Sequence, residues 1–159
     1  MKKLLVALLM LVVAVPLWAQ TKVEEPKDEA SMLARGKDSY MHRKFDDAFK
    51  YLSQVADSGN VEAKYYVAEC YYYGYGVDVD TKKAVSMFKA LTTNGYLFAN
   101  YSLGHAYEYG YGGLEKNKTT AQTYYKKAIP AIKEYAEKGD ILSQYRLGLC
   151  YFLGDGIEE

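Results

Sequence analysis

The chain from Ala63 onward repeats one pattern three times. The pattern Ala-x-x-x-Val-Ala-x-x-Tyr-x-x-Gly-x-Gly begins at Ala63 and returns with small changes at Ala99 and Ser143, so that successive copies start 36 and 44 residues apart. A period of this length with helix-type spacing is typical of repeat proteins, whose units bury their apolar faces only by stacking on neighbours. The pattern therefore predicts an all-α solenoid of stacked helical pairs. It also points to a binding surface rather than a pocket.

The first nineteen residues have the layout of a secretory signal peptide. Lys2 and Lys3 precede an uncharged apolar run that ends at Ala19-Gln20. We expect cleavage after Ala19 and export to the periplasm or the exterior, with no stable membrane insertion afterwards. An uncleaved anchor helix is the alternative, because the run approaches the roughly 17–25 residues of a membrane span. Pro16 near the end of the run favours removal.

The remaining chain has a balanced charge. Without residues 1–19 it carries 18 basic and 20 acidic side chains, a formal charge of −2. Nucleic acid is not expected as a partner, because there is no basic stripe to neutralise phosphates. Residues 20–30 are mostly charged or small, include Pro26 and predict a short linker. About 140 residues suffice for one domain, which we place at 31–159.

Each repeat is predicted to form two helices. In the second repeat the first helix runs over about 61–73 and ends at Gly74, and the second begins near Thr81. The small residues Ala68 and Gly104 predict that the two helices of a pair approach closely. The expected repeats are 31–60, 61–96, 97–140 and a truncated copy at 141–159.

The repeats resemble two related families. The first copy, with Gly36, Phe45, Ala48 and Leu52, resembles a tetratricopeptide repeat, and the A-x-x-x-L-G-x-x-Y-x-x-G-x-G signature of the later copies resembles Sel1-like repeats. The resemblance covers about 31–159. It implies an α/α solenoid that acts as an adaptor or scaffold for other proteins, often exported in bacteria. Some secreted members hold each repeat with its own disulfide, but this chain lacks those cysteine pairs, so the activity of that subgroup is not carried over.

The two cysteines are predicted to be packing residues. Cys70 and Cys150 occupy the same position of the second and fourth repeats. Helix axes pack roughly 8–10 Å apart, which places the two Cα atoms beyond the roughly 7 Å limit for a disulfide.

The third repeat has seven extra residues in its second helix, expected over about Thr119–Lys138. Seven residues are close to two turns, so the buried face stays in phase and includes Ala121, Ile132 and Tyr135. Pro130 should kink this helix because its ring displaces a backbone hydrogen bond.

Helix geometry defines a candidate site on the concave face. The inward positions of the first helices are Tyr65, Glu69, Tyr72 and Tyr73, then Tyr101, His105, Glu108 and Tyr109, then Tyr145, Leu149, Phe152 and Leu153. Tyr65, Tyr101 and Tyr145 recur in every copy and are expected to pack. The residues that differ between copies are the predicted partner-binding set: Glu69, Tyr72, Tyr73, His105, Glu108 and Tyr109. Tyrosine provides rigid contact area with a hydrogen-bonding tip, which suits protein and peptide recognition.

Other functions find less support. Glu69, His105 and Glu108 lack any metal-ligand spacing, and no catalytic or cofactor motif is present. We therefore expect a non-enzymatic interaction scaffold of the cell envelope without a cofactor. Stacked tyrosines with carboxylates also suit sugar rings, so carbohydrate binding or envelope remodelling is the alternative.

The end of the repeat array is predicted to be an interface. Leu149, Phe152 and Leu153 lie on the last helix, and no second helix follows to cover them. Exposed apolar patches mark interaction sites, so we expect this end to pair with a second copy, as a homodimer, or with a separate protein.

Overall fold

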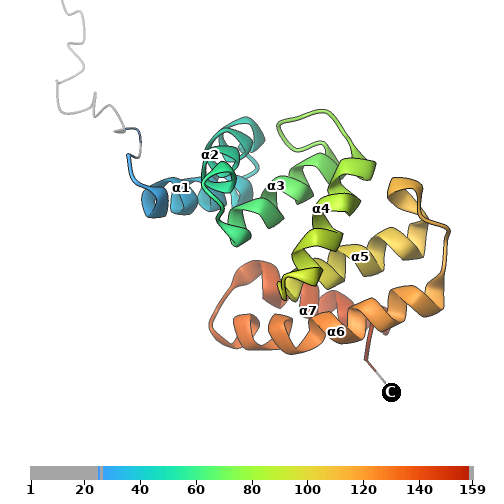
Figure 1. Cartoon of the computed structure of the whole chain (residues 1–159). Helices are drawn as coiled ribbons and strands as arrows, with labels where there is room; N and C mark the ends of the chain where they lie inside the picture. The colour runs from blue at the N-terminus through green and yellow to red at the C-terminus, as the bar shows by residue number, and fades with distance from the viewer. Residues whose placement is uncertain (1–24, 26, 158–159) are drawn as a thin grey trace, which may run out of the picture.

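The computed structural model describes residues 25 and 27–157, and within this range the chain is all-helical (Figure 1). The elements in order are α1 (Glu29–Met41), α2 (Phe45–Asp57), α3 (Val61–Tyr73), α4 (Thr81–Thr93), α5 (Phe98–Tyr109), the short 3₁₀ turn η2 (Tyr111–Gly113), α6 (Lys118–Glu137) and α7 (Ile141–Leu153). Consecutive helices pack antiparallel in a curved stack, which confirms the predicted α/α solenoid. The predicted signal peptide, 1–19, lies outside the described residues. None of the helices between α1 and α7 combines the length and apolar character that crossing a membrane requires.

Side-chain caps fix where the helices begin. Asp28, Asn60, Asp80, Asn117 and Asp140 each accept a hydrogen bond from the backbone N–H three residues later. Such caps satisfy one of the free N–H groups at a helix start. They account for the close agreement between the predicted and observed starts of α3 and α4.

The first helix begins earlier than expected. It starts at Glu29 after the cap Asp28, inside the stretch 20–30 that was assigned to the linker. Glu25 also contacts the fold, because its carboxylate accepts a hydrogen bond from Tyr51 and pairs with Lys50 at 3.3 Å. This part of the predicted linker therefore lies against α2.

The first glycine of each Gly-x-Gly pair ends a helix, as predicted. Gly74, Gly110 and Gly154 adopt left-handed φ values of 75°, 75° and 72° after α3, α5 and α7. A side chain is strained in this conformation, whereas glycine adopts it freely.

The second glycine of each pair docks the loop onto the preceding repeat. A Cβ atom at Gly76 would lie 2.2 Å from the carbonyl oxygen of Phe45, the first residue of α2. A Cβ atom at Gly112 would lie 2.6 Å from the carbonyl oxygen of Thr81, the first residue of α4. These contacts leave no room for a side chain, so the loops are joints between repeats as well as turns.

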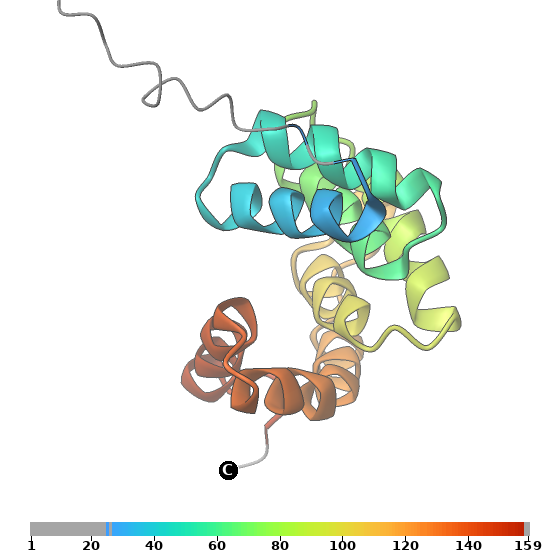
Figure 2. The ribbon, with the colours of Figure 1, turned by 90° about the vertical axis from the view of Figure 1, so that its left-hand side faces the viewer.

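The last joint is displaced along α6. A Cβ atom at Gly156 would lie 2.5 Å from Tyr125 and Lys126, whereas α6 begins at Lys118. The fourth repeat therefore docks seven residues further along its partner helix than the earlier repeats do, which is a shift of about 10 Å at 1.5 Å per residue. The seven extra residues of the third repeat supply this length. Figure 2 shows the result, an arc with α1 and α2 on one arm and α7 on the other.

Small residues let the paired helices approach closely. Ala68 of α3 and Ala84 of α4 are both fully buried. Gly104 of α5 lies under the ring of Tyr125 of α6, and a Cβ atom at Gly104 would lie 2.6 Å from that ring, which confirms the predicted close approach. The equivalent Gly148 of α7 has nothing within 4 Å of its Cβ position.

The two cysteines are packing residues, as predicted. Cys70 and Cys150 are free and buried, as expected, and burial raises the pKa of Cys70 to about 12.

Helix α6 continues through Pro130, with Ala121 and Ile132 buried. Tyr135 was expected to point inward, but it is 43% exposed. Its ring instead rests edge-on against Phe98.

Candidate functional site

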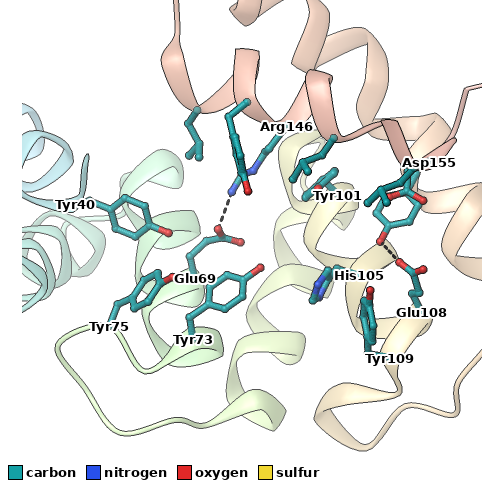
Figure 3. A pocket seen from close by; sticks show the side chains of 15 residues that line it. Tyr40, Glu69, Tyr73, Tyr75, Tyr101, His105, Glu108, Tyr109, Arg146 and Asp155 are labelled. Carbon is teal, nitrogen blue, oxygen red and sulfur yellow. Dashed lines mark hydrogen bonds and ion pairs between the residues drawn. The ribbon is translucent and has the colours of Figure 1, made fainter. Parts of the chain in front are cut away.

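The inner side of the arc holds a pocket of about 330 Å³, which we call the inner pocket. Its walls come from α1, α3, α5, α6, α7 and the glycine loops, so that it spans all four repeats (Figure 3). It brings together five of the six predicted partner-binding residues: Glu69, Tyr73, His105, Glu108 and Tyr109. Helix spacing thus placed these five residues on one face, but that face forms a pocket, whereas the repeat pattern pointed to an open surface.

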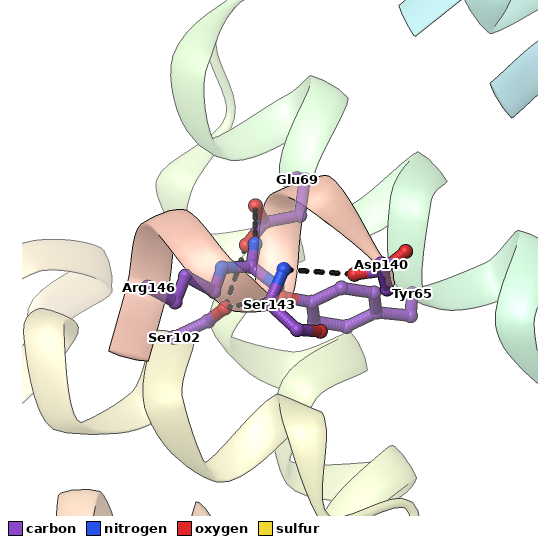
Figure 4. Close-up of polar contacts among 6 residues, drawn as sticks. All are labelled: Tyr65, Glu69, Ser102, Asp140, Ser143 and Arg146. Atoms are coloured by element: carbon purple, nitrogen blue, oxygen red, sulfur yellow. Dashed lines mark hydrogen bonds and ion pairs between the residues drawn. The ribbon is translucent and has the colours of Figure 1, made fainter. Parts of the chain in front are cut away.

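Glu69 is buried and neutralised rather than presented to solvent. Its Oε2 accepts a hydrogen bond from Nη2 of Arg146 at 2.6 Å, and its Oε1 accepts one from the Ser102 hydroxyl at 2.6 Å. The two charged side chains are 3% and 6% exposed. This ion pair joins α3 to α7 across the inner face (Figure 4).

Two tyrosine rings enclose the guanidinium of Arg146. The centroids of Tyr65 and Tyr101 lie 5.3 and 5.4 Å from its central carbon, within the range of a cation–π interaction. The Tyr65 hydroxyl lies 3.2 Å from that of Ser102, which extends the network. Tyr65 and Tyr101 are buried, as their recurrence in three copies predicted. The same prediction is wrong for Tyr145, which is 63% exposed.

Tyr72, the sixth residue of the predicted partner-binding set, is not available to a partner on the surface, because it is only 5% exposed. Its ring packs against Phe88 of α4 and His105 of α5, and its hydroxyl lies 3.0 Å from Nδ1 of His105. The reason is that Tyr72 lies between Phe88 of α4 and His105 of the next repeat, which together cover its ring.

His105 is half-buried between these rings. Burial lowers the pKa of its imidazole, against the opposing effect of the carboxylates of Glu108 and Glu69. The side chain is therefore neutral at pH 7. No group of three or more metal-binding side chains occurs within the described part of the chain, so Glu69, His105 and Glu108 do not form a metal centre there.

Exposed tyrosines stand at the mouth of the inner pocket. Tyr73 is 40% exposed, Tyr109 is 50% exposed and Tyr111, in the loop after α5, is 45% exposed. The Tyr109 and Tyr111 rings stack with centroids 5.9 Å apart, and Tyr73 stacks on Tyr75 at 5.3 Å. These rings give the pocket a rigid aromatic rim.

Two charged residues of the pocket, Arg146 and Asp155, were not identified in the sequence analysis. Arg146 stands where the second and third repeats have Tyr66 and Ser102, and Asp155 stands where they have the loop tyrosines Tyr75 and Tyr111. Both are charged and both are buried, at 5% and 4% exposure. A charged residue that departs from the pattern at a buried repeat position was the available signal.

The predicted terminal interface is divided between two surfaces. Leu149 is half-buried and lines the inner pocket with Leu153, while Phe152 is 84% exposed. Further exposed apolar residues on α7 are Ile141, Tyr145 and Tyr151. The role of this end in association stays a prediction.

Comparisons with known proteins identify the repeats. The Sel1 repeat family matches residues 61–96, 97–129 and 141–159, more than half of the chain. A relative, the putative sel1-like repeat-containing protein L21 of Acanthamoeba polyphaga mimivirus, is 32% identical over 125 residues, which cover 65% of this chain and 24% of the relative.

Two solved structures share the fold. One is c5321, a protective antigen of uropathogenic Escherichia coli strains that displays an SLR fold, with 27% identity and a TM-score of 0.52 over 82% of this chain and 27% of that chain. The other is a Sel1 repeat protein from Oxalobacter formigenes, with 27% identity and a TM-score of 0.55 over 78% of this chain and 35% of that chain. The chain spans about a quarter to a third of the length of these relatives. Sel1 repeat proteins are in general scaffolds for protein interactions, and this chain belongs to the Sel1 repeat family.

Proposed function

We propose that this Sel1 repeat protein binds a protein or peptide segment in its inner pocket and catalyses no reaction. The observation that carries the proposal is the exposed aromatic rim over a concave, polar pocket. Tyrosine side chains bind with little loss of conformational entropy and combine apolar contact with a hydrogen-bonding hydroxyl. The Glu69–Arg146 pair also joins α7 to α3 across the pocket.

Export to the cell envelope is part of the same proposal. It rests on the layout of residues 1–19, with Lys2 and Lys3 ahead of an apolar run and Ala19-Gln20 at its end. A partner in the periplasm or outside the cell follows from it. Envelope extract is therefore the source in which to search.

The experiment compares capture by three forms of the protein. The first is the unchanged protein and the second is the Tyr73→Ala, Tyr109→Ala variant. The third is a Tyr135→Ala control, whose tyrosine is similarly exposed but lies outside the inner pocket. Aromatic hot spots contribute about 2 kcal/mol or more each, so each rim substitution should weaken partner binding by about 30-fold. Tyr72 is left unchanged because its ring is part of the core.

The control separates specific capture from general stickiness. A partner held by the unchanged protein and by Tyr135→Ala, but not by the rim variant, supports the proposal. Equal capture by all three forms would remove the inner pocket from consideration. The same three forms on a glycan array test the carbohydrate alternative, which gains if a sugar binds and the rim variant loses it.

A further inference from the structure

The carboxylates of the inner pocket are not all neutralised. Glu69 has Arg146 as its counter-ion, whereas Glu108 and Asp155 form no ion pair with any described residue. The Oε2 atom of Glu108 accepts a hydrogen bond from the Tyr125 hydroxyl at 2.8 Å, and Oδ1 of Asp155 accepts one from Nε2 of Gln122 at 3.3 Å. Figure 3 shows Glu108 and Asp155 on the same side of the pocket, away from Arg146.

Asp155 is the more unusual of the two because it is only 4% exposed and yet lines the pocket. Burying a carboxylate without a counter-ion is unfavourable. Burial and, after it, the charge of Glu108 raise the pKa of Asp155, and only the hydrogen bond from Gln122 opposes them. This carboxyl group is thus held in a place that favours a cation beside it.

The backbone adds to the negative potential. Glu108 lies in the last turn of α5, and Asp155 follows the last turn of α7 by two residues. Helix C-termini carry a partial negative charge of about half an electron. Basic side chains often offset that charge, but neither α5 nor α7 has one in its last turn.

Aromatic rings complete the wall of this half of the pocket. Tyr101 and Tyr109 line the pocket together with the two carboxylates. The face of a tyrosine ring attracts ammonium and guanidinium groups. The pocket volume of about 330 Å³ is at the lower end of the about 300–1,000 Å³ of ligand pockets, which suits one side chain better than a large ligand.

We propose that the space between Glu108 and Asp155 receives a basic side chain, a lysine or arginine of the partner. The proposal rests on the proposed function and specifies the chemistry of the segment bound. The ammonium or guanidinium group pairs with both carboxylates, and the aliphatic part of the side chain lies against the tyrosine rings. Arg146 cannot fill this role because Glu69 and the rings of Tyr65 and Tyr101 hold it.

Three small probes test this subsite with the full chain. They are the Nα-acetyl methylamides of lysine, arginine and norleucine, the last having no charge. Binding is followed by NMR titration of the tyrosine ring signals. We expect the lysine or arginine probe to bind about tenfold more tightly than the norleucine probe.

Matched variants locate the effect. Asp155→Asn and Glu108→Gln keep shape and remove charge, and each should reduce the preference for the charged probes at least threefold. Glu115→Gln, at an exposed carboxylate outside the inner pocket, should leave it unchanged. Asp155→Asn should also leave the melting temperature unchanged or raise it, since a buried charge is lost. Equal binding of the three probes, or a preference that survives both pocket variants, overturns the proposal.

The experiments distinguish failure of the basic-side-chain subsite from failure of the proposed scaffold function. If partner capture depends on Tyr73 and Tyr109 but is unchanged by Asp155→Asn and Glu108→Gln, the scaffold function stands and the subsite is wrong. If partner capture is unchanged by Tyr73→Ala and Tyr109→Ala while binding of the lysine probe still requires Asp155, the subsite is supported and the scaffold proposal is wrong.

Discussion

Two glycines at the same repeat position offer a direct measure of how tightly the helices of a pair are packed. Gly104 of α5 lies under the ring of Tyr125, and a Cβ atom there would be 2.6, 2.7 and 3.0 Å from three ring atoms. Gly148 of α7 has nothing within 4 Å of its Cβ position. The two positions therefore differ in packing while they share a helical backbone.

The magnitudes follow from this difference. Glycine to alanine in a helix interior stabilises by about 1 kcal/mol through helix propensity, and this gain applies at both positions. At Gly104 the ring must move, and Tyr125 is 1% exposed with its hydroxyl bonded to Glu108, so overpacking should cost about 1–3 kcal/mol. Gly148→Ala should thus stabilise by up to about 1 kcal/mol. The free energy of unfolding of Gly104→Ala should be about 1–3 kcal/mol lower than that of Gly148→Ala.

Urea denaturation followed by far-ultraviolet circular dichroism measures both variants on one scale. Gly104→Leu, a larger change at the covered position, should lose at least the same 1–3 kcal/mol relative to the unchanged protein. Equal stabilisation by the two alanine variants would refute the close pairing of α5 with α6. So would an unchanged midpoint for Gly104→Leu.

Three further predictions concern other parts of the molecule. Arg146→Met leaves the Glu69 carboxylate buried without its counter-ion and should lower the free energy of unfolding by about 3–5 kcal/mol. In the same urea assay the Glu69→Gln, Arg146→Met double variant should recover most of this loss, and additive losses would show that the pair is not coupled. Cleavage after Ala19 should give a mature chain that begins at Gln20. The intact mass of protein isolated from its native envelope tests this cleavage, and a retained N-terminus in the membrane fraction would contradict it. The exposed end of α7 should support association, so sedimentation of the unchanged protein should show a dimer or a complex with a partner. The Leu149→Glu, Phe152→Glu variant should lose this association. If both forms sediment as monomers of equal stability, the predicted interface is wrong.

The fold was accessible from the sequence because its determinants are local. Helix α3 runs over Val61–Tyr73, as predicted, because a side-chain cap at Asn60 and a left-handed glycine at Gly74 define its two ends within the chain itself. The repeat pattern then implied stacking, since each unit repeats the same apolar positions. Neither inference required knowledge of how the repeats curve.

The site was only partly accessible because its details depend on that curvature. Glu69, His105 and Tyr109 could be assigned to one face from helix spacing, and the inner pocket does contain them. The burial of Tyr72 depends on how closely α5 packs beside α3, which spacing along one helix does not give. The contribution of Arg146 depends on where α7 crosses the arc.

The displaced last joint explains why two charged residues of the pocket, Arg146 and Asp155, could not be identified from the sequence. Gly156 meets α6 seven residues beyond the position used by the earlier joints, which moves α7 about 10 Å along that helix and brings it over the inner face. There Arg146 of α7 meets Glu69 of α3, and an apolar residue in place of either one would leave the other without its counter-ion. Glu69 and Arg146 pair at this crossing, and moving α7 away from α3 while either side chain stays buried would leave a charge without its counter-ion. The same displacement places Asp155 beside Glu108, and none of the residues that the structure describes forms an ion pair with it. The seven extra residues of α6 therefore account both for the crossing of α7 over α3 and for the position of Asp155 beside Glu108.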